Sequence, residues 1–413
     1  MNFIYNIGIY LANFVLHCSS GFNTKIKSGI DGRKQSFKTL QSSLTPNDKT
    51  LWFHCASLGE YEQGLPIFEA LRKQYTTHKI VLTFFSPSGY EVRKNTPIAD
   101  VVVYLPMDTP KNAERFINLL QPELTVFVKY DIWPNYLNKI KKHQLRAILI
   151  SAAFRENQLY FKPFGKPLRD ALFAFEHIFT QNEVSKTLLE SINFNHVTVS
   201  GDTRFDRVSN QLKQDNTLPF VEEFKSNQLC VVIGSSWPED EVLLTEYINN
   251  QAPKNVKFII APHDIKSSHI KNIEALLKVP YVLFSKKDNT HLQSASVFII
   301  DTIGLLTKIY NYADIAYVGG AMGNTGLHNT LEPAVFGVPV VIGKNYDKFP
   351  EAKDLINNGG MFSIANQTEL KHILDELINN EVKRLDTGTA NATFIMKNKG
   401  AVIQILDYLR IYK

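Results

Sequence analysis

A glycine-rich loop at residues 317–343 carries the residues whose types and spacing are most specific for ligand binding. It reads YVGGAMGNTGLHNTLEPAVFGVPVVIG, and an apolar strand is followed within eight residues by Gly319, Gly320, Gly323 and Gly326. Glycine lets a backbone approach a ligand closely because it has no Cβ. The loop then delivers His328, Asn329 and Glu332 to a predicted helix N-terminus, where unpaired N–H groups attract an anion such as phosphate.

Thr330 is predicted to be the N-cap of this helix, which places Pro333 in the first turn, where a missing N–H is harmless. The Glu332 carboxylate suits the vicinal hydroxyls of a sugar better than it suits a second anion. Packing alone is the alternative explanation of the glycines. The polar residues at the end of the loop favour ligand binding, because binding residues are concentrated on loops that a rigid scaffold positions.

Other polar residues also directly follow apolar runs. Ser57-Leu58-Gly59-Glu60 follows the run Leu51–Ala56 and spells a capping box, so Glu60 either caps a helix or serves as a functional carboxylate. In the first half of the chain, four more short segments with polar residues follow apolar runs. They are 86–89, 107–110, Lys129-Tyr130-Asp131, and 151–155, which ends with Arg155. In the second half they are 235–237, Pro262-His263-Asp264, and 301–305, which ends with Ile303-Gly304-Leu305.

These sets need strands to position them, and the sequence predicts two series of strands. Short, β-branched apolar runs alternate with helix-length segments, which is typical of buried parallel strands. The first series is Leu51–Ala56, Ile80–Phe85, Val101–Leu105, Leu124–Val128, Ala147–Ile150 and Ile178–Thr180. The second is Cys230–Gly234, Phe258–Ala261, Tyr281–Phe284, Val297–Ile300, Ile315–Val318 and Val338–Ile342. In open α/β sheets ligands bind outside the carboxyl ends of the strands, where the polar sets lie.

The predicted fold class is therefore α/β, with two Rossmann-like domains facing each other across a cleft. No Walker motif or G-x-G-x-x-G follows the first strand, which argues against a phosphate-loop NTPase or a dinucleotide dehydrogenase. A G-x-S-x-G nucleophile elbow is also absent. By architectural analogy, this combination suggests a sugar-nucleotide glycosyltransferase of the GT-B type.

Length and composition are consistent with two globular domains. A chain of 413 residues exceeds the size at which single cores stop growing. A net charge of +5 is mild for nucleic-acid binding, and no nucleic acid is expected as a partner. The three cysteines have no paired metal-ligand spacing, so no metal site is expected.

The N-terminal residues 3–18 predict an amphipathic helix at a membrane surface. As a helix they would span roughly 24 Å, against a hydrocarbon core of about 30 Å. Phe3, Ile7, Leu11 and Phe14 share one face, and a basic cluster follows that includes Lys25, Lys27, Arg33, Lys34 and Lys38. This pattern favours a helix in the membrane interface near anionic head groups over a span or a secretory signal. A helix docked on the protein's own surface is the alternative.

The predicted domain organisation has five parts. Residues 1–48 form the membrane-associating helix and basic segment, and 49–208 form an N-terminal Rossmann-like acceptor domain. Residues 209–228 are a predicted linker, because 209–217 are polar and Pro219 follows. A C-terminal Rossmann-like donor domain covers 229–395, and a C-terminal helix at 396–413 is expected to pack back on the N-terminal domain.

Six segments resemble the 3-deoxy-D-manno-octulosonic acid (Kdo) transferase family of lipopolysaccharide synthesis. They are WFHCASLGEYEQG, KYDIWPNYL, SGDTRFD, DTIGLL, ADIAYVGG and GLHNTLEPAVFGVPVVIG. The resemblance implies transfer of Kdo from CMP-Kdo to the lipid A precursor, with inversion at the anomeric carbon. It also implies no required metal or other cofactor, and a location at the cytoplasmic face of a Gram-negative inner membrane, with the membrane surface as a partner.

The resemblance also assigns roles to residues. Glu60 is similar to the family's general base, which takes the proton of the attacking hydroxyl. Lys129 and Asp131 stand where the family usually has paired carboxylates before L-W-P-N, so either Asp131 or Lys129 carries the transition-state role. Arg204 replaces a lysine of the family and is expected to stabilise the leaving phosphate. A linker arginine paired with Asp202 or Asp206 is the alternative.

For the donor, the family's contacts correspond here to three loops: Pro262-His263, Ile303-Gly304-Leu305 and Asn329-Thr330-Leu331-Glu332. Two departures are that A-P-R-H becomes Ala261-Pro262-His263-Asp264 and that G-E-L becomes Gly304-Leu305-Leu306. A binding site for the phosphorylated, acylated acceptor is expected at Ser57 and Arg155. Arg155 opens a basic stretch with Lys162, Lys166 and Arg169, interleaved with Phe154, Tyr160, Phe161 and Phe164, and an ordinary solvated helix face is the alternative there.

Two other functions fit the same sequence. One is another two-domain sugar-nucleotide enzyme, such as a UDP-sugar transferase or epimerase. The second is a non-catalytic scaffold at the membrane surface, which would bind lipid and would not respond to any nucleotide.

Overall fold

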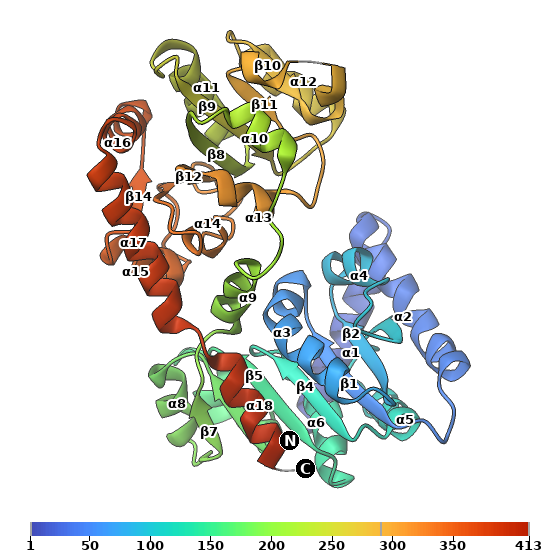
Figure 1. The fold of residues 1–413 in the computed structure, drawn as a ribbon. Helices are drawn as coiled ribbons and strands as arrows, with labels where there is room; N and C mark the ends of the chain where they lie inside the picture. Colours follow the sequence, from blue (N-terminus) through green and yellow to red (C-terminus); the bar gives the residue numbers. More distant parts are fainter. Residues whose placement is uncertain (1, 290, 412–413) are drawn as a thin grey trace. The chain divides into compact units, whose positions relative to one another are not determined.

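The apolar runs form two seven-stranded sheets in the computed structural model, which describes residues 2–289 and 291–411 (Figure 1). The chain divides into two units. Unit 1 consists of the described residues within Met1–Arg207 and Lys399–Lys413, and unit 2 of those within Val208–Asn398. Every strand pairing in both sheets is parallel. The prediction of two Rossmann-like α/β domains is confirmed.

The sheet of unit 1 has the order β3-β2-β1-β4-β5-β6-β7. Its strands are β1 Thr50–Cys55, β2 Lys79–Phe84, β3 Val101–Tyr104, β4 Leu124–Val128, β5 Ala147–Ala152, β6 His177–Thr180 and β7 Val197–Val199. The strand order reverses direction between β1 and β4, which pair from Leu51↔Leu124 to His54↔Phe127. Such a switch point leaves a crevice outside the carboxyl ends of the two strands.

Helices cover both faces of this sheet. They are α1 Asn2–Ser19, α2 Thr24–Ser43, α3 Leu58–Gln74, α4 Pro87–Arg93, α5 Pro110–Leu120, α6 Pro134–Lys142, α7 Lys166–Leu172, α8 Glu183–Glu190, α9 Thr203–Gln211, which runs on into unit 2, and α18 Ala401–Ile411. Side chains alternate between faces along a strand, so Trp52 joins the core on one face and Phe53 the core on the other. The second core also takes Ile405 and Leu409 of α18, so the chain returns to unit 1 after leaving unit 2.

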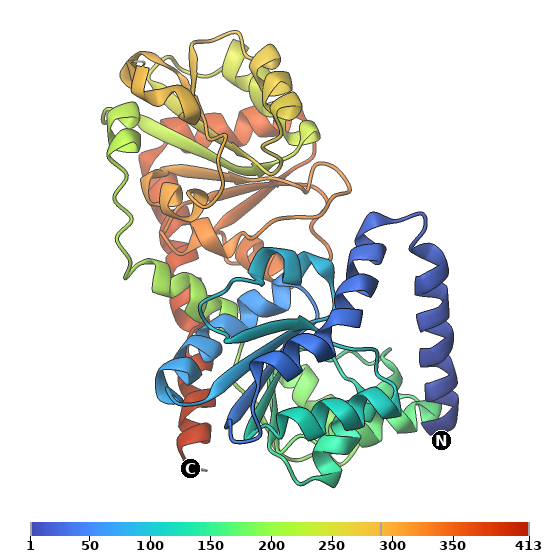
Figure 2. The same ribbon diagram turned by 90° about the vertical axis from the view of Figure 1, so that its right-hand side faces the viewer.

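Helix α1 is attached to unit 1 by one face. The Tyr5 hydroxyl donates to Asp108 Oδ2 at 2.7 Å, and Asn135 Nδ2 donates to Asn6 Oδ1 at 2.8 Å. The apolar face is exposed, with Phe3 at 75% and Phe14 at 66%. Figure 2 shows α1 joined to α2 by a short turn. Neither α1 nor any other helix in the described part of the chain is both long and apolar enough to cross a membrane.

The basic segment after α1 is helical, because α2 spans most of it. Asn23 caps α2 by accepting the N–H groups of Lys25 and Ile26 at 3.0 and 3.2 Å. Arg33 is not available to head groups: it donates to the Phe85 carbonyl at 2.5 Å and lies 4.3 Å from the centre of the Phe85 ring. Burial lowers the pKa of this guanidinium. Arg33, one cation of the predicted basic cluster, therefore takes part in packing within unit 1.

The sheet of unit 2 has the order β10-β11-β9-β8-β12-β13-β14. Its strands are β8 Leu229–Ser236, β9 Val256–Pro262, β10 Tyr281–Leu283, β11 Val297–Ile299, β12 Ile315–Val318, β13 Val340–Gly343 and β14 Met361–Ile364. The helices are α10 Pro219–Lys225, α11 Pro238–Asn250, α12 Ser267–Leu276, α13 Leu306–Ile309, α14 Leu331–Ala334, α15 Pro350–Asn357, α16 Gln367–Asn379 and α17 Glu381–Asn398. The order reverses between β8 and β12, so unit 2 has a switch point of its own.

The predicted linker at 209–228 is not an open connection along its length. It begins within α9 and contains α10, a helix that starts at Pro219. Val221 and Phe224 of α10 are fully buried, and the Phe224 ring centre lies 5.2 Å from that of Phe298. Burial of two apolar residues three positions apart holds this part of the segment to unit 2.

Candidate active site at the two switch points

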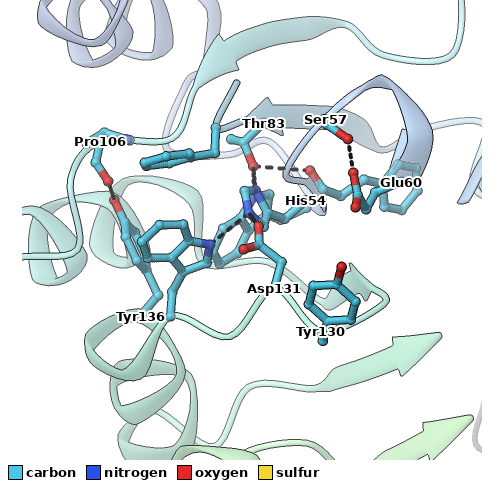
Figure 3. Close-up of polar contacts among 12 residues, drawn as sticks. His54, Ser57, Glu60, Thr83, Pro106, Tyr130, Asp131 and Tyr136 are labelled. Carbon is cyan, nitrogen blue, oxygen red and sulfur yellow. Dashed lines mark hydrogen bonds and ion pairs between the residues drawn. The ribbon is translucent and has the colours of Figure 1, made fainter. Parts of the chain in front are cut away.

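In unit 1 the candidate catalytic residues lie where β1 and β4 end. Glu60 is in the first turn of α3, which follows β1, and Asp131 is in the loop between β4 and α6 (Figure 3). Cys55, the last residue of β1, is buried near both. Burial raises the pKa of its thiol well above the ordinary value, and the negative charges of Glu60 and Asp131 raise it further. Both carboxylates thus follow the strands at the switch point of this sheet.

Ser57 contacts Glu60 and does not cap the helix. Its hydroxyl donates to Glu60 Oε2, whereas within the described residues its side chain accepts no backbone N–H of α3. The capping box that the sequence spells is therefore not formed in this way. Glu60 is partly exposed and lies at the positive end of the helix dipole, which favours a carboxylate. The contact orients the carboxylate and leaves it accessible.

Asp131 is bonded to a buried histidine. Its Oδ2 lies 2.5 Å from His54 Nε2, while Nδ1 of the same ring lies 2.8 Å from Thr83 Oγ1 (Figure 3). The Asp131 side chain is 18% exposed and the His54 side chain is fully buried. The sequence analysis overlooked His54, although a polar residue within the apolar run LWFHC is a usable signal.

Lys129 directly follows β4 and has a φ of 70°, in the left-handed region that non-glycine residues rarely adopt. Its amine lies 5.2 Å from the centre of the Tyr130 ring. Among the described residues it forms no ion pair with Asp131. Lys129 and Asp131, the two candidates for the transition-state role, thus do not pair with each other among the described residues. Asp131 is held in place by its hydrogen bond to His54.

Arg204 is paired with a carboxylate, as the alternative interpretation predicts. Its Nε and Nη2 each lie 2.8 Å from Asp202 Oδ2. Asp202 Oδ1 also accepts from Gln63 Nε2 at 3.3 Å, and Gln63 lies one turn beyond Glu60 on α3. A hydrogen-bonded chain thus links Arg204 to the helix that carries Glu60. The pairing with Asp202 fixes the guanidinium.

The basic stretch that was expected to meet the acceptor is largely structural. Arg169 donates to the carbonyls of Tyr160 and Lys162 at 2.8 and 2.6 Å, and Lys166 pairs with Asp170 at 3.2 Å. Arg169 shapes its own loop because a guanidinium can satisfy two carbonyls at once. Arg155 is exposed in the turn after β5. Of the four cations, the structure leaves Arg155 best placed for a ligand.

In unit 2 a buried carboxylate organises the glycine-rich loop. Asp240 of α11 accepts the backbone N–H of Trp237 at 2.9 Å, that of Gly320 at 2.8 Å and the Tyr317 hydroxyl at 2.8 Å. Burial raises the pKa of Asp240. The sequence analysis missed this residue, although its position three residues after Trp237, at the start of a helix, is a recognisable signal.

The glycines serve backbone packing as well as access. A Cβ on Gly319 would lie 2.4 Å from the Ser235 carbonyl oxygen. Gly320 has a φ of 97°, and a Cβ there would lie 2.1 Å from the Gly326 carbonyl oxygen. Packing alone therefore explains these two residues, and the evidence for ligand binding in this loop comes from its polar side chains.

Three aromatic rings stack at the carboxyl ends of β8, β9 and β12. The Trp237 and His263 ring centres are 4.6 Å apart, and those of His263 and His328 are 4.5 Å apart. Trp237 Nε1 donates to His328 Nε2 at 3.0 Å. Burial and the neighbouring His263 lower the pKa of His328 to about 4, and desolvation lowers that of His263. Both imidazoles are therefore neutral at pH 7.

The predicted cap of the last candidate loop is wrong by one residue. Thr330 has helical dihedral angles and makes no capping bond, whereas Asn329 Oδ1 accepts the N–H of Leu331 at 3.1 Å. A cap needs extended backbone, which Thr330 does not have. Asn329 Nδ2 also donates to Glu332 Oε1 at 3.1 Å. The two polar side chains of this loop are thus held together.

The other residues predicted to contact the donor differ in how exposed their side chains are. Pro262 and Leu331 are buried, so neither side chain faces a ligand. Ile303 is 79% exposed, beside Gly304, which has a φ of 88°. Leu305 is half-buried. In the described part of the chain, no group of three or more His, Cys, Asp or Glu side chains is arranged to hold a metal ion.

Two parallel seven-stranded sheets with flanking helices give the chain an α/β fold of the GT-B type. The UDP-GlcNAc 2-epimerase from Neisseria meningitidis, solved with bound UDP-GlcNAc, superimposes with a TM-score of 0.61 over 87% of this chain and 99% of that one. At 15% sequence identity, the likeness concerns the fold alone.

Sequence comparison is more specific. The family model described as 3-deoxy-D-manno-octulosonic-acid transferase matches residues 31–207. The 3-deoxy-D-manno-octulosonic acid transferase of Haemophilus influenzae is 26% identical over 384 residues, 89% of this chain and 88% of that protein. The one from Aquifex aeolicus is 29% identical over 351 residues, 84% of this chain and 88% of that protein. The chain is thus similar to Kdo transferases over most of its length.

Proposed function

We propose that the chain transfers Kdo from CMP-Kdo to a hydroxyl group of the lipid A precursor, with inversion at the anomeric carbon. The family match supports the donor and the reaction class. The observation that carries the proposal is geometric: Glu60 lies in the first turn after β1, and Asp131, in the loop after β4, is bonded to His54 of β1 at the same switch point. No metal ion or cofactor has a part in the proposed reaction.

In the proposed reaction Glu60 acts as the general base. The acceptor oxygen forms a bond to the anomeric carbon while Glu60 takes its proton and CMP leaves with the bonding electrons. The Ser57 hydroxyl supports this role because it orients the carboxylate without covering it. Ser57 also borders the proposed acceptor site, with Arg155 as the exposed cation available to an acceptor phosphate.

Three side chains are candidates for stabilising the charge that develops during the transfer. Asp131 stabilises positive charge on the sugar ring, since opposite charges attract strongly in a site with little water. Lys129 is the alternative for the transition-state role in that loop. Arg204 stabilises the leaving phosphate, and its pairing with Asp202 supports the role by fixing the direction of the guanidinium.

The donor is assigned to the loops of unit 2. The neutral rings of His263 and His328 and the Asn329–Glu332 pair supply hydrogen-bonding groups and aromatic surface for CMP-Kdo. Ile303-Gly304-Leu305 contributes an exposed side chain and an accessible backbone. Pro262, Thr330 and Leu331 contribute through the backbone, because their side chains are buried.

We further propose that the enzyme works at the cytoplasmic face of the inner membrane, held by α1. The exposed apolar face of α1 supports this, since residues such as Leu11 and Phe14 are 60% and 66% exposed. Changing both to Asp should sharply reduce flotation with anionic lipid vesicles. Val184→Asp, which alters a residue of similar exposure on α8, is the control. Equal flotation of all three proteins would contradict the assignment.

The rate of Kdo transfer by the Glu60→Gln variant tests the role of Glu60 as general base. Removal of a general base costs about 10²- to 10⁴-fold in rate, so transfer of labelled Kdo to the lipid A precursor should fall by that factor. Glu69→Gln changes an exposed carboxylate on the same helix and should leave the rate unchanged. Near-normal transfer by Glu60→Gln would exclude Glu60 as the base.

A further inference from the structure

A fully buried histidine contacts one of the carboxylates that the proposed function uses. His54 lies on β1 two residues after Trp52, so its side chain is on the same face of the sheet and points into the core. A buried imidazole requires a hydrogen-bond partner for each ring nitrogen. The two partners identify what the residue does.

Thr83 of β2 fixes one side of the ring. Its Oγ1 lies 2.8 Å from His54 Nδ1, 2.8 Å from Trp52 Nε1 and 3.3 Å from the Phe53 carbonyl oxygen. Trp52 can only donate and the Phe53 carbonyl can only accept. Thr83 therefore either donates to Phe53 and accepts from His54, or donates to His54. Both arrangements hold the ring in one orientation.

Asp131 is the partner on the other side. Nε2 and Oδ2 are 2.5 Å apart, and two lone pairs cannot approach so closely, so one hydrogen lies between them. Trp133, two residues after Asp131, directs its indole N–H toward Nε2 from 3.0 Å, so the indole and the carboxylate meet the same ring nitrogen. A hydrogen bond in which one partner is charged is shorter and stronger than a neutral one.

The contact has a consequence for Asp131. Among the described residues His54 is its hydrogen-bond partner through Oδ2, which leaves Oδ1 available at a side chain that is 18% exposed. The loop also contains Lys129, whose backbone is in the left-handed region, and within the described residues the bond to His54 is the restraint on the carboxylate. Without the imidazole, rotation of the Asp131 side chain would be restricted by packing alone.

We infer that His54 is a positioning residue for the transfer reaction: fixed by Thr83, it holds the Asp131 carboxylate at the end of β4 with one oxygen directed to the reacting sugar. The inference rests on the proposed function, in which Asp131 stabilises the transition state. It extends that function by assigning a role to a core residue that does not touch substrate.

The shared hydrogen can be detected without any activity assay. In the full chain labelled with ¹⁵N-histidine, His54 should give a strongly downfield imidazole N–H resonance. The resonance should be lost in Asp131→Asn and in His54→Gln and should persist in His78→Gln. His78 is the matched control, because it is a buried histidine whose Nε2 lies 2.8 Å from Glu123 Oε2, outside the candidate site. Persistence of the resonance in Asp131→Asn would overturn the assigned contact.

Kinetics test the positioning role. Loss of alignment of a reacting group costs on the order of 100-fold, so kcat of His54→Gln should fall by that factor while KM for CMP-Kdo stays unchanged. His78→Gln should keep the normal kcat. The double variant His54→Gln/Asp131→Asn should be no slower than Asp131→Asn alone, because His54 acts through Asp131.

The two hypotheses fail in different ways. Additive losses in the double variant, or normal kcat in His54→Gln, would overturn the positioning role while Kdo transfer by the unaltered chain still stood. Absence of Kdo transfer by the unaltered chain would overturn the proposed function, whereas the resonance test would remain valid. Should His54→Gln fail to fold, Asp131→Asn alone decides the resonance test.

Discussion

At the scale of single residues, local sequence and tertiary contact disagree about Ser57 and Glu60. Their spacing is that of a capping box, yet in the structure the serine hydroxyl bonds to the carboxylate. The motif predicts that the two side chains lie close together. It does not determine whether each one bonds to backbone or to the other, because both arrangements have the same spacing.

Ser57→Ala should therefore slow Kdo transfer without unfolding α3. Loss of one hydrogen bond to a charged group is worth about 1.5–3 kcal/mol, and part of that should appear as roughly a tenfold lower kcat because the Glu60 carboxylate loses its orientation. Ser57→Thr keeps the hydroxyl and should restore most of the rate. Helix content from circular dichroism should match in all three proteins. A large loss of helix in Ser57→Ala would show that Ser57 is a cap after all.

The side-chain contacts between distant parts of the chain could not be predicted from the sequence. His54, Thr83 and Asp131 are brought together only by the pairing of β1 with β2 and by the side-by-side ends of β1 and β4. The chain separates them by tens of residues, and a single sequence contains no information on that contact. Arg204 differs, because Asp202 lies only two residues before it and a pairing with Asp202 or Asp206 is one of the two interpretations that the sequence allows.

At the scale of elements, strands buried on both faces were predictable, whereas two of the four edge strands were not. Central runs such as Ile80–Phe85 and Leu124–Val128 are apolar throughout, so burial on both faces shows in the sequence. The sequence analysis missed β7 and β14, which are short outermost strands with half-buried residues. It also predicted a linker where α10 folds, since two buried residues in a polar context give a weak pattern.

The junction of α1 with unit 1 makes a prediction about pH. Asp108 accepts the Tyr5 hydroxyl and the backbone N–H groups of Asn135 and Tyr136, but its complete burial dominates and raises its pKa from 3.8 to about 6. A raised folded-state pKa means that proton binding stabilises the folded protein. The contribution is complete below pH 3.8 and is lost as the pH rises through 6, with a total of about 3 kcal/mol.

The comparison that tests this is between the unaltered chain and Asp108→Asn, which does not titrate. The difference in free energy of unfolding between the two proteins, from denaturant titrations between pH 4 and pH 7.5, should shift in favour of the variant as the pH rises. Groups common to both proteins cancel in the difference. A difference that does not vary with pH, or one that shifts in the opposite direction, would contradict the assignment.

At the scale of the whole molecule, the chain keeps its candidate acceptor and donor chemistry on separate sheets. Glu60, Asp131 and Arg204 belong to unit 1, whereas His263, Ile303 and the Asn329–Glu332 pair belong to unit 2. Glu60 and Asp131 lie where the order of the unit 1 sheet reverses, and the Asn329–Glu332 pair follows β12 at the reversal in the unit 2 sheet. In the proposed function the donor loops all belong to unit 2, so the choice of nucleotide is assigned to these loops.

Nucleotide binding should consequently be selective for CMP over UDP. It should not depend on Glu60, the proposed general base. A ligand at 100 times its Kd stabilises a protein by about 2.7 kcal/mol, so CMP should raise the melting temperature measurably and UDP should not. Glu60→Gln should show the same CMP response as the unaltered chain, because its altered residue lies in unit 1. Asn329→Ala removes the amide that bonds to Glu332 and caps Leu331, so its response should be weaker. Stabilisation by UDP in preference to CMP would favour a UDP-sugar enzyme, and vesicle binding with no response to either nucleotide would favour a scaffold.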